Sequence, residues 1–247
     1  MKYTAAFFKD TMPDWKRKKD SLIARYFHRP ISFYFSSFFA EIGLTANQVS
    51  FISLIIAIIA CVLFLFDNRF AHISGAVLIN IWSITDSADG NMARSIGGKP
   101  YGDFIDATSS YVMVGFLLPI LGWSTYRNGG WLFQQGDGLI ILVGAIAGIS
   151  DTMSRLFFQK MKCNTFEQKA DGIASSENGV SEDSTIKRLY NRIESELGLG
   201  GWNMPAILIC ASLRSLDLYV VFYAFYYGVM FIVSTCYLIK KTNCLRN

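Results

Sequence analysis

Long apolar runs alternate with short polar stretches along most of the chain. The runs cover residues 49–66, 70–84, 104–123, 139–158, 202–213 and 216–239. A helix needs about 20 apolar residues to cross a bilayer, and shorter runs with polar positions suit helices that face a bundle interior. The pattern therefore predicts an all-α integral membrane protein with six transmembrane helices. A soluble all-α protein is the alternative, but the uncharged stretch 218–239 argues against it.

The polar stretches predict the remaining organisation. Residues 14–44 begin basic and become aromatic, which is typical of an N-terminal amphipathic helix lying at the membrane interface. Within the long polar segment 159–200, we predict a mobile loop over 167–183 and a short amphipathic helix over 187–197, acting as a wall of the site or as a connector. The predicted parts are an N-terminal segment (1–48), a six-helix domain (49–241) and a cytoplasmic tail (242–247).

The distribution of basic residues predicts the orientation of the chain in the membrane. All 23 Lys and Arg residues except Arg69, Arg127 and Arg214 fall in segments that the six-helix topology places on one side. The positive-inside rule assigns that side to the cytoplasm. The net charge of +4 follows from this topology, so no nucleic-acid partner is expected. The basic run 16–19 instead favours anionic lipid headgroups.

Acidic residues interrupt the pattern at the inner ends of the second and third runs. An Asp inside a transmembrane helix costs about 2.5–3.5 kcal/mol on insertion scales. Asp86 and Asp89 are spaced i, i+3 on one helix, and Gly102 and Asp106 are spaced i, i+4 on the next. Two helix ends thus bring acids and glycines to one place. Divalent cations that neutralise the acids, with a phosphate close to the glycines, are the simplest physical reason.

This spacing resembles the signature of the CDP-alcohol phosphotransferase (CDP-alcohol phosphatidyltransferase) family. That signature is Asp-x2-Asp-Gly-x2-Ala-Arg, followed after a short gap by Gly-x3-Asp-x3-Asp. The resemblance is dense over residues 29–110. The chain departs from the signature at Ser110, where the family has an Asp. The matching positions are Asp86, Asp89, Gly90, Ala93, Arg94, Gly102 and Asp106.

The resemblance implies a transferase that moves a phospho-alcohol group from a CDP-linked donor to an acceptor alcohol and releases CMP, in phospholipid or related lipid or glycan synthesis. Whether donor or acceptor carries the lipid stays open, and a homodimer is compatible with the sequence. The implied metal ligands are Asp86, Asp89 and Asp106. The implied donor-binding residues are Gly90, Ala93, Arg94 and Gly102.

An oxygen-rich site of this kind suits Mg²⁺ or Mn²⁺. The three carboxylates carry −3 and a bound pyrophosphate adds about −2, so two divalent cations nearly balance the total. A metal-free Asp/Arg network is the alternative, although three acids set against Arg94 and Lys99 leave excess negative charge. An ion-coupled transporter is the rival function, because intramembrane acids also mark ion pathways.

Ser110 replaces an Asp that, in the family, acts as general base and touches a metal. A serine hydroxyl stays protonated near neutral pH and does not serve as an ionised base. Three explanations stay open. Asp103 supplies the carboxylate, although it lies two turns, about 10 Å, from position 110. Otherwise the acceptor arrives as an ionised phosphate, or the chain binds the donor and turns it over poorly.

Three smaller features complete the predictions. Thr45 or Asn47 is placed to cap the first membrane helix. Gly144 and Gly148 form a small-x3-small face that favours helix packing. Asp151 and Arg155 are spaced i, i+4, which fits either an intrahelical salt bridge or an Arg155 that holds an anionic acceptor.

Overall fold

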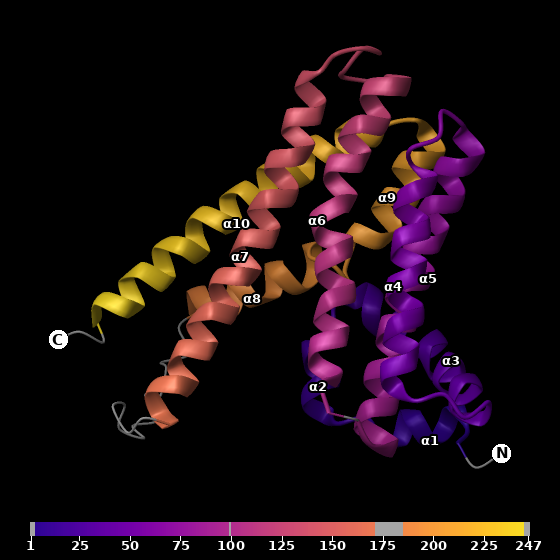
Figure 1. Ribbon diagram of the computed structural model, residues 1–247, viewed down its shortest axis with the longest axis vertical. Coiled ribbons are helices and arrows are strands. Elements are labelled where there is room, and N and C mark those ends of the chain that lie inside the picture. Colours follow the sequence, from indigo (N-terminus) through magenta and orange to yellow (C-terminus); the bar gives the residue numbers. More distant parts are fainter. Residues whose placement is uncertain (1–2, 99, 171–184, 245–247) are drawn as a thin grey trace. The chain divides into compact units, whose positions relative to one another are not determined.

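The structure is a computed structural model that describes residues 3–98, 100–170 and 185–244 (Figure 1). All regular structure in these residues is helical, which confirms the all-α class. Two of the helices, η1 and η2, are single π-type turns. In chain order the helices are α1 (Ala5–Asp10), α2 (Asp14–Lys19), η1 (Ala24–His28), α3 (Arg29–Glu41), α4 (Ala46–Leu63), α5 (Arg69–Met92), η2 (Ala93–Gly97), α6 (Gly102–Asn128), α7 (Leu139–Ala170), α8 (Thr185–Leu197), α9 (Asn203–Leu213) and α10 (Leu216–Cys244).

Four helices are long and apolar enough to cross a membrane. These candidate spans are Ala46–Leu63, Gly102–Asn128, Leu139–Glu167 and Leu216–Lys240. The predicted multi-pass membrane protein is therefore confirmed at the level of four candidate spans. The other two predicted spans correspond to α5, whose inner end is polar, and to α9. With 11 residues, α9 is about 17 Å long, which is short of the ~30 Å hydrocarbon core.

The chain divides into two compact units. The first unit comprises Met1–Met113 and Ile186–Leu216, and the second comprises Val114–Thr185 and Asp217–Asn247. The first unit is therefore discontinuous in sequence, and its two pieces are joined through the whole of 114–185. Every residue of the acidic signature belongs to the first unit.

Helices α4 and α5 form the centre of the first unit and lie side by side (Figure 1). α4 begins at a capping box, in which the Thr45 hydroxyl accepts a hydrogen bond from the Gln48 amide and the Gln48 side chain accepts one from the Thr45 amide. This confirms Thr45 as the cap. A Cβ at Gly75 would lie 3.0 Å from the Ala60 carbonyl oxygen, so this glycine allows the two helices to approach closely.

The N-terminal helices pack beneath the inner ends of α4 and α5. The segment predicted as one helix over 14–44 is divided into α2, η1 and α3, because Asp20 leaves the helical conformation and pairs with Arg29. On α3, Tyr34 and Phe38 are exposed, whereas Phe33 is buried. The apolar core under the site comprises Phe8, Met12, Phe33, Ala46, Val49 and Met92.

The second unit contains the later part of α6 with α7 and α10. A Cβ at Gly144 would lie 2.5 Å from the Leu118 carbonyl oxygen, and one at Gly148 would lie 2.8 Å from Pro119. Both glycines therefore pack α7 against α6, as predicted. α7 continues to Ala170, 12 residues past its predicted end at 158, because polar residues extend the helix beyond the apolar run.

The polar segment after α7 only partly lies within the described residues. Residues 167–170 belong to α7 and not to the predicted loop, whose remainder over 171–183 lies outside the described residues. The helix predicted over 187–197 is present as α8, and it ends before Gly198. Its Ser195 hydroxyl donates to the Lys19 carbonyl oxygen at 3.0 Å, and its Glu196 carboxylate accepts from the Leu22 amide at 3.1 Å. These contacts join α8 to the N-terminal helices.

Candidate functional site

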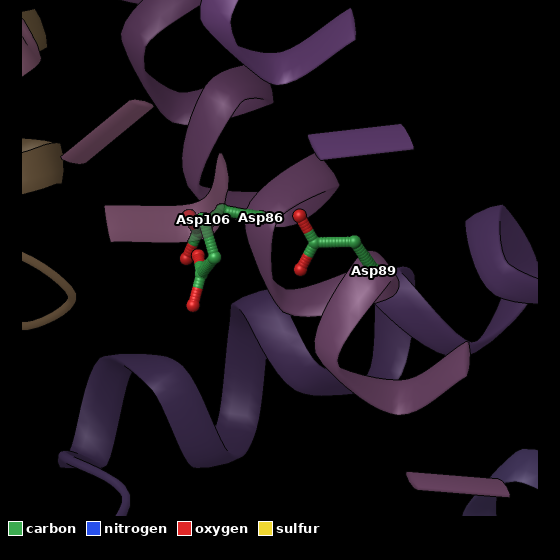
Figure 2. Close-up of side chains that lie close together, drawn as sticks. All are labelled: Asp86, Asp89 and Asp106. Carbon is green, nitrogen blue, oxygen red and sulfur yellow. The ribbon is translucent and has the colours of Figure 1, made fainter. Parts of the chain in front are cut away.

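Helices α5 and α6 bring three acidic side chains together. Asp86 and Asp89 lie on the last turns of α5, and Asp106 lies on the second turn of α6. One ligand oxygen from each lies within 4.8 Å of the others. Figure 2 shows the three carboxylates close together, with Asp89 pointing toward the other two. The spacing in the sequence therefore predicts this juxtaposition correctly.

The chemistry of this cluster fits a hard divalent cation. All three groups offer carboxylate oxygens, which Mg²⁺ and Mn²⁺ prefer. Asp89 is 4% exposed, and its Oδ2 accepts a hydrogen bond from the Ser50 hydroxyl on α4. The buried Oδ1 of Asp86 has no hydrogen-bond partner among the described residues. A buried acceptor without a donor is unfavourable, and a cation at the cluster would satisfy it.

A pocket of about 630 Å³ opens beside the acids, and all of its lining belongs to the first unit. Asp89 and Asp106 contribute the acidic part of this lining. The four predicted donor-binding residues also line it, which places them beside the acids. The lining residues are Ala46, Asn47, Ser50, Asp89, Gly90, Ala93, Arg94, Gly98, Tyr101, Gly102, Asp103, Phe104 and Asp106.

The two glycines of the signature make room for neighbouring polar side chains. A Cβ at Gly90 would lie 3.0 Å from both terminal nitrogens of Arg94. The absence of a side chain at 90 therefore lets the Arg94 guanidinium fold back over α5. A Cβ at Gly102 would lie 3.2 Å from Asn47 Oδ1. The room expected for a nucleotide is thus bordered by Arg94 and Asn47.

Asp103 and Ser110 occupy different environments on α6. Asp103 is exposed and lines the pocket. Ser110 is half-buried one turn beyond Asp106, and the pocket lining formed by the described residues does not include it. The adjacent Ser109 is fully buried, where its hydroxyl lies 2.9 Å from Ser53 Oγ and accepts from Trp82 Nε1 at 2.9 Å.

The basic run 16–19 is not uniform in the structure. Arg17, Lys18 and Lys19 are exposed, as a lipid-facing cluster requires. Lys16 is half-buried, and its Nζ lies 3.4 Å from Asp20 Oδ1. Burial lowers the pKa of Lys16, and the charge of Asp20 opposes that shift. Lys16 is therefore set apart from the three exposed residues of the run, and their binding of lipid headgroups stays a prediction.

Sequence reasoning considered Asn47 only as a helix cap, and it assigned no role to Ser50 or Asn91. The spacing of Asn47 and Ser50 at i, i+3 in an apolar helix was an available signal for a polar face. Asn91 lies inside the signature, yet its spacing alone does not reveal its partners. The structure shows that Asn91 accepts a hydrogen bond from Arg94 at 3.1 Å.

Arg155 lies in the second unit. Its Nε lies 2.9 Å from Asp151 Oδ1, so the predicted intrahelical salt bridge is present. Asp151 also takes part in a hydrogen bond with Tyr227. The charges of Arg155 and Asp151 are therefore paired within the second unit. The acceptor-binding role of Arg155 stays a prediction.

Comparison with known proteins identifies the domain that contains the site. No curated protein was found to match the chain. Residues 43–162 match the family model described as CDP-alcohol phosphatidyltransferase. The match covers α4 to most of α7, and therefore every acid and glycine of the pocket. The chain thus carries, over residues 43–162, a domain of the CDP-alcohol phosphatidyltransferase family, which is a family of transferases.

Proposed function

We propose that the protein is a membrane phosphotransferase that moves a phospho-alcohol group from a CDP-linked donor to an acceptor and releases CMP. The observation that carries this proposal is the pocket in which Asp89, Asp106 and Arg94 meet within the matched domain. Acids suited to cations and a guanidinium suited to phosphate together fit a diphosphate-linked donor. Such a reaction belongs to the synthesis of phospholipids or related lipids and glycans.

Two divalent cations, Mg²⁺ or Mn²⁺, are the proposed cofactors, and Asp86, Asp89 and Asp106 are their proposed ligands. When bound, such ions stabilise negative charge on the attacking and leaving oxygens of the substitution. The Ser50 hydroxyl fixes the orientation of the Asp89 carboxylate through its hydrogen bond. The apolar core under α4 and α5 holds the two helix ends in register.

Arg94 and Asp103 have proposed roles at the reacting groups. The Arg94 guanidinium would bind the donor's diphosphate in bidentate fashion. The Asp103 carboxylate would take the proton of the acceptor hydroxyl, which compensates for Ser110. The acceptor oxygen then bonds to the phosphorus that carries the donor's alcohol, the bond from that phosphorus to the bridging oxygen breaks, and CMP leaves with that oxygen. The position of Asp103 in the pocket lining supports this assignment.

The membrane arrangement extends the four candidate spans to six. α5 has 24 residues, about 36 Å of helix, which is enough to reach through the hydrocarbon core. α9 is proposed as the sixth, and its short length requires neighbouring segments to complete the crossing. The exposed rings of Tyr34 and Phe38 support an interfacial position for α3. The distribution of basic residues supports a cytoplasmic location of the pocket.

An assay of CMP release tests this function. Purified protein is incubated with CDP-diacylglycerol or a small CDP-alcohol, with Mn²⁺ and with candidate lipid or polar acceptors. We expect acceptor-dependent release of CMP that a chelator abolishes. Donor binding without CMP release would instead indicate a catalytically silent relative, and no metal-dependent donor binding would contradict the proposal. Mass analysis of the lipid that copurifies with the protein identifies which substrate is the lipid.

A further inference from the structure

Asn91 lies between two arginine side chains at the inner end of α5. It is buried, and its Oδ1 accepts from Arg94 Nη2 at 3.1 Å and from Arg29 Nη1 at 3.0 Å. Its Nδ2 donates to Ser32 Oγ at 3.0 Å and to Ser36 Oγ at 3.3 Å. These four contacts leave the amide one favourable orientation, with its oxygen toward the guanidinium groups.

Arg29 is fixed independently of Asn91. Its Nε and Nη2 donate to the two carboxylate oxygens of Asp20, each at 3.0 Å, in a bidentate pair. Both side chains are buried. Asp20 Oδ1 also lies 3.4 Å from Lys16 Nζ, and the bidentate pair of Asp20 with Arg29 forms a rigid support for the Asn91 amide.

The amide at position 91 matters because it carries no charge. Two guanidinium groups share its oxygen, and among the described residues only Arg29 of the two has a bidentate carboxylate partner. Asn91 therefore orients Arg94 without neutralising it. A carboxylate at 91 would also accept both hydrogen bonds, but it would compensate the positive charge that Arg94 presents beside the pocket.

We propose that Asn91 is a positioning residue that holds the Arg94 guanidinium at the pocket and preserves its charge for the donor's diphosphate. This inference rests on the proposed donor-binding role of Arg94. The Arg29–Asp20 pair acts through Asn91, since neither residue is in the pocket lining formed by the described residues. Asn91 thereby links the N-terminal helices to the geometry of the donor pocket.

A double-mutant cycle tests the coupling. The affinity for CDP in the presence of Mn²⁺ is measured by calorimetry for the parent, Asn91→Ala, Arg94→Ala and the double variant. A hydrogen bond to a charged group changes affinity by about tenfold to a hundredfold, so Asn91→Ala should weaken CDP binding by about tenfold. The double variant should bind CDP no more weakly than Arg94→Ala, because Asn91 contributes to CDP binding only by orienting the Arg94 guanidinium.

Two further variants separate positioning from folding and from charge. Asn80 is another amide on α5, and it donates to the carbonyl oxygens of Ala76 and Met204. Asn80→Ala should lower Tm and leave CDP affinity unchanged. Asn91→Asp keeps the accepting oxygens, but it should also weaken CDP binding, because its charge compensates Arg94.

The outcomes distinguish this inference from the proposed function. If the parent binds CDP but the losses from Asn91→Ala and Arg94→Ala add in the double variant, the positioning role is overturned and the function stands. The same conclusion follows if Asn91→Ala changes CDP affinity no more than Asn80→Ala does. If the parent shows no metal-dependent CDP binding at all, the proposed function fails, and this inference fails with it.

Discussion

Buried carboxylates occur in both units, and their surroundings differ. In the second unit, Asp151 lies 2.9 Å from the guanidinium of Arg155, one helical turn away. In the first unit, Asp86, Asp89 and Asp106 approach one another within 4.8 Å. Asp151 is thus compensated by its own helix, whereas the three acids gather like charges from two helices.

The two arrangements have different energetic consequences. The negative charge of a buried acid such as Asp151 is compensated by an adjacent basic side chain. Its presence in the fold therefore requires no bound ligand. In the first unit, Asp89 is buried, Asp86 is half-buried and Asp106 is exposed. Because the three carboxylates lie close together, their negative charges repel one another. The pair in the second unit is therefore a structural salt bridge, whereas the cluster in the first unit is the proposed cation site. The following predictions test whether this contrast holds.

The largest expected effect is in the acidic cluster. Asp89→Asn removes one ligand charge while it keeps the size of the side chain. Because metal stabilisation of the transition state amounts to several kcal/mol, CMP release should fall by roughly 10⁴-fold or more. Titration with Mn²⁺ should show weakened metal binding as well. Asp151→Asn is the matched control, and equal losses of Mn²⁺ affinity in both variants would remove the contrast between the units.

Asp103 and Ser110 provide the next test, on the same helix as Asp106. If Asp103 is the general base, Asp103→Asn should lower turnover by about 10²–10⁴-fold with donor affinity retained. Ser110→Asp, made in parallel, should then change the rate little, because the base is already present. Faster CMP release in Ser110→Asp would show that the missing base limits the rate. No change in either variant would favour an acceptor that arrives ionised.

In the second unit, the Asp151 pair should matter for stability. Asp151→Asn leaves the Arg155 charge without its carboxylate. Since the Arg155 side chain is one-third exposed, solvent moderates the loss, and we expect about 1–3 kcal/mol of destabilisation, seen as a lower Tm. Arg155→Gln should have a similar effect and leave KM for the acceptor unchanged. A raised KM with an unchanged Tm would instead place Arg155 at the acceptor.

The smallest effects are expected for the same substitution, Gly to Ala, at one glycine in each unit. Gly144→Ala places a methyl group against the Leu118 carbonyl oxygen, and overpacking of this kind typically costs about 1–3 kcal/mol. Gly90→Ala meets only the flexible end of Arg94, so Tm should change little while donor affinity falls several-fold. If Gly90→Ala destabilises the protein and spares donor binding, Gly90 is a packing residue like Gly144.

Local patterns predicted the elements that depend on nearby residues. A cap at Thr45 or Asn47, the close packing at Gly144 and the meeting of Asp86 with Asp106 all follow from short spacings combined with helix geometry, and the structure places the cap at Thr45. The length of α7 was underestimated, because an apolar run marks only the membrane-crossing part of a helix and does not indicate whether polar residues continue it. The break in the N-terminal helix was missed for a different reason, since it depends on the Asp20–Arg29 pair.

Contacts between distant segments were beyond prediction from a single sequence. Ser50 reaches Asp89 across 39 residues, and Arg29 reaches Asn91 across 62 residues. The type of each residue is compatible with many partners, and only the packing of α3, α4 and α5 selects one. The acids of the site were therefore predictable as a group, whereas the residues that orient them were not.

The discontinuity of the first unit has a consequence for the order in which the protein is made. The hydroxyl of Ser21 donates to the carbonyl oxygen of Gly200, 179 positions later, and Asn80 donates to that of Met204. Ribosomes deliver the N-terminal helices, the acids and all of α7 before either acceptor exists. The first unit, which holds the pocket, therefore cannot form these two hydrogen bonds until translation has passed α9. Nascent chains released before that point would carry every residue of the signature and still lack the last contacts of the unit that holds it.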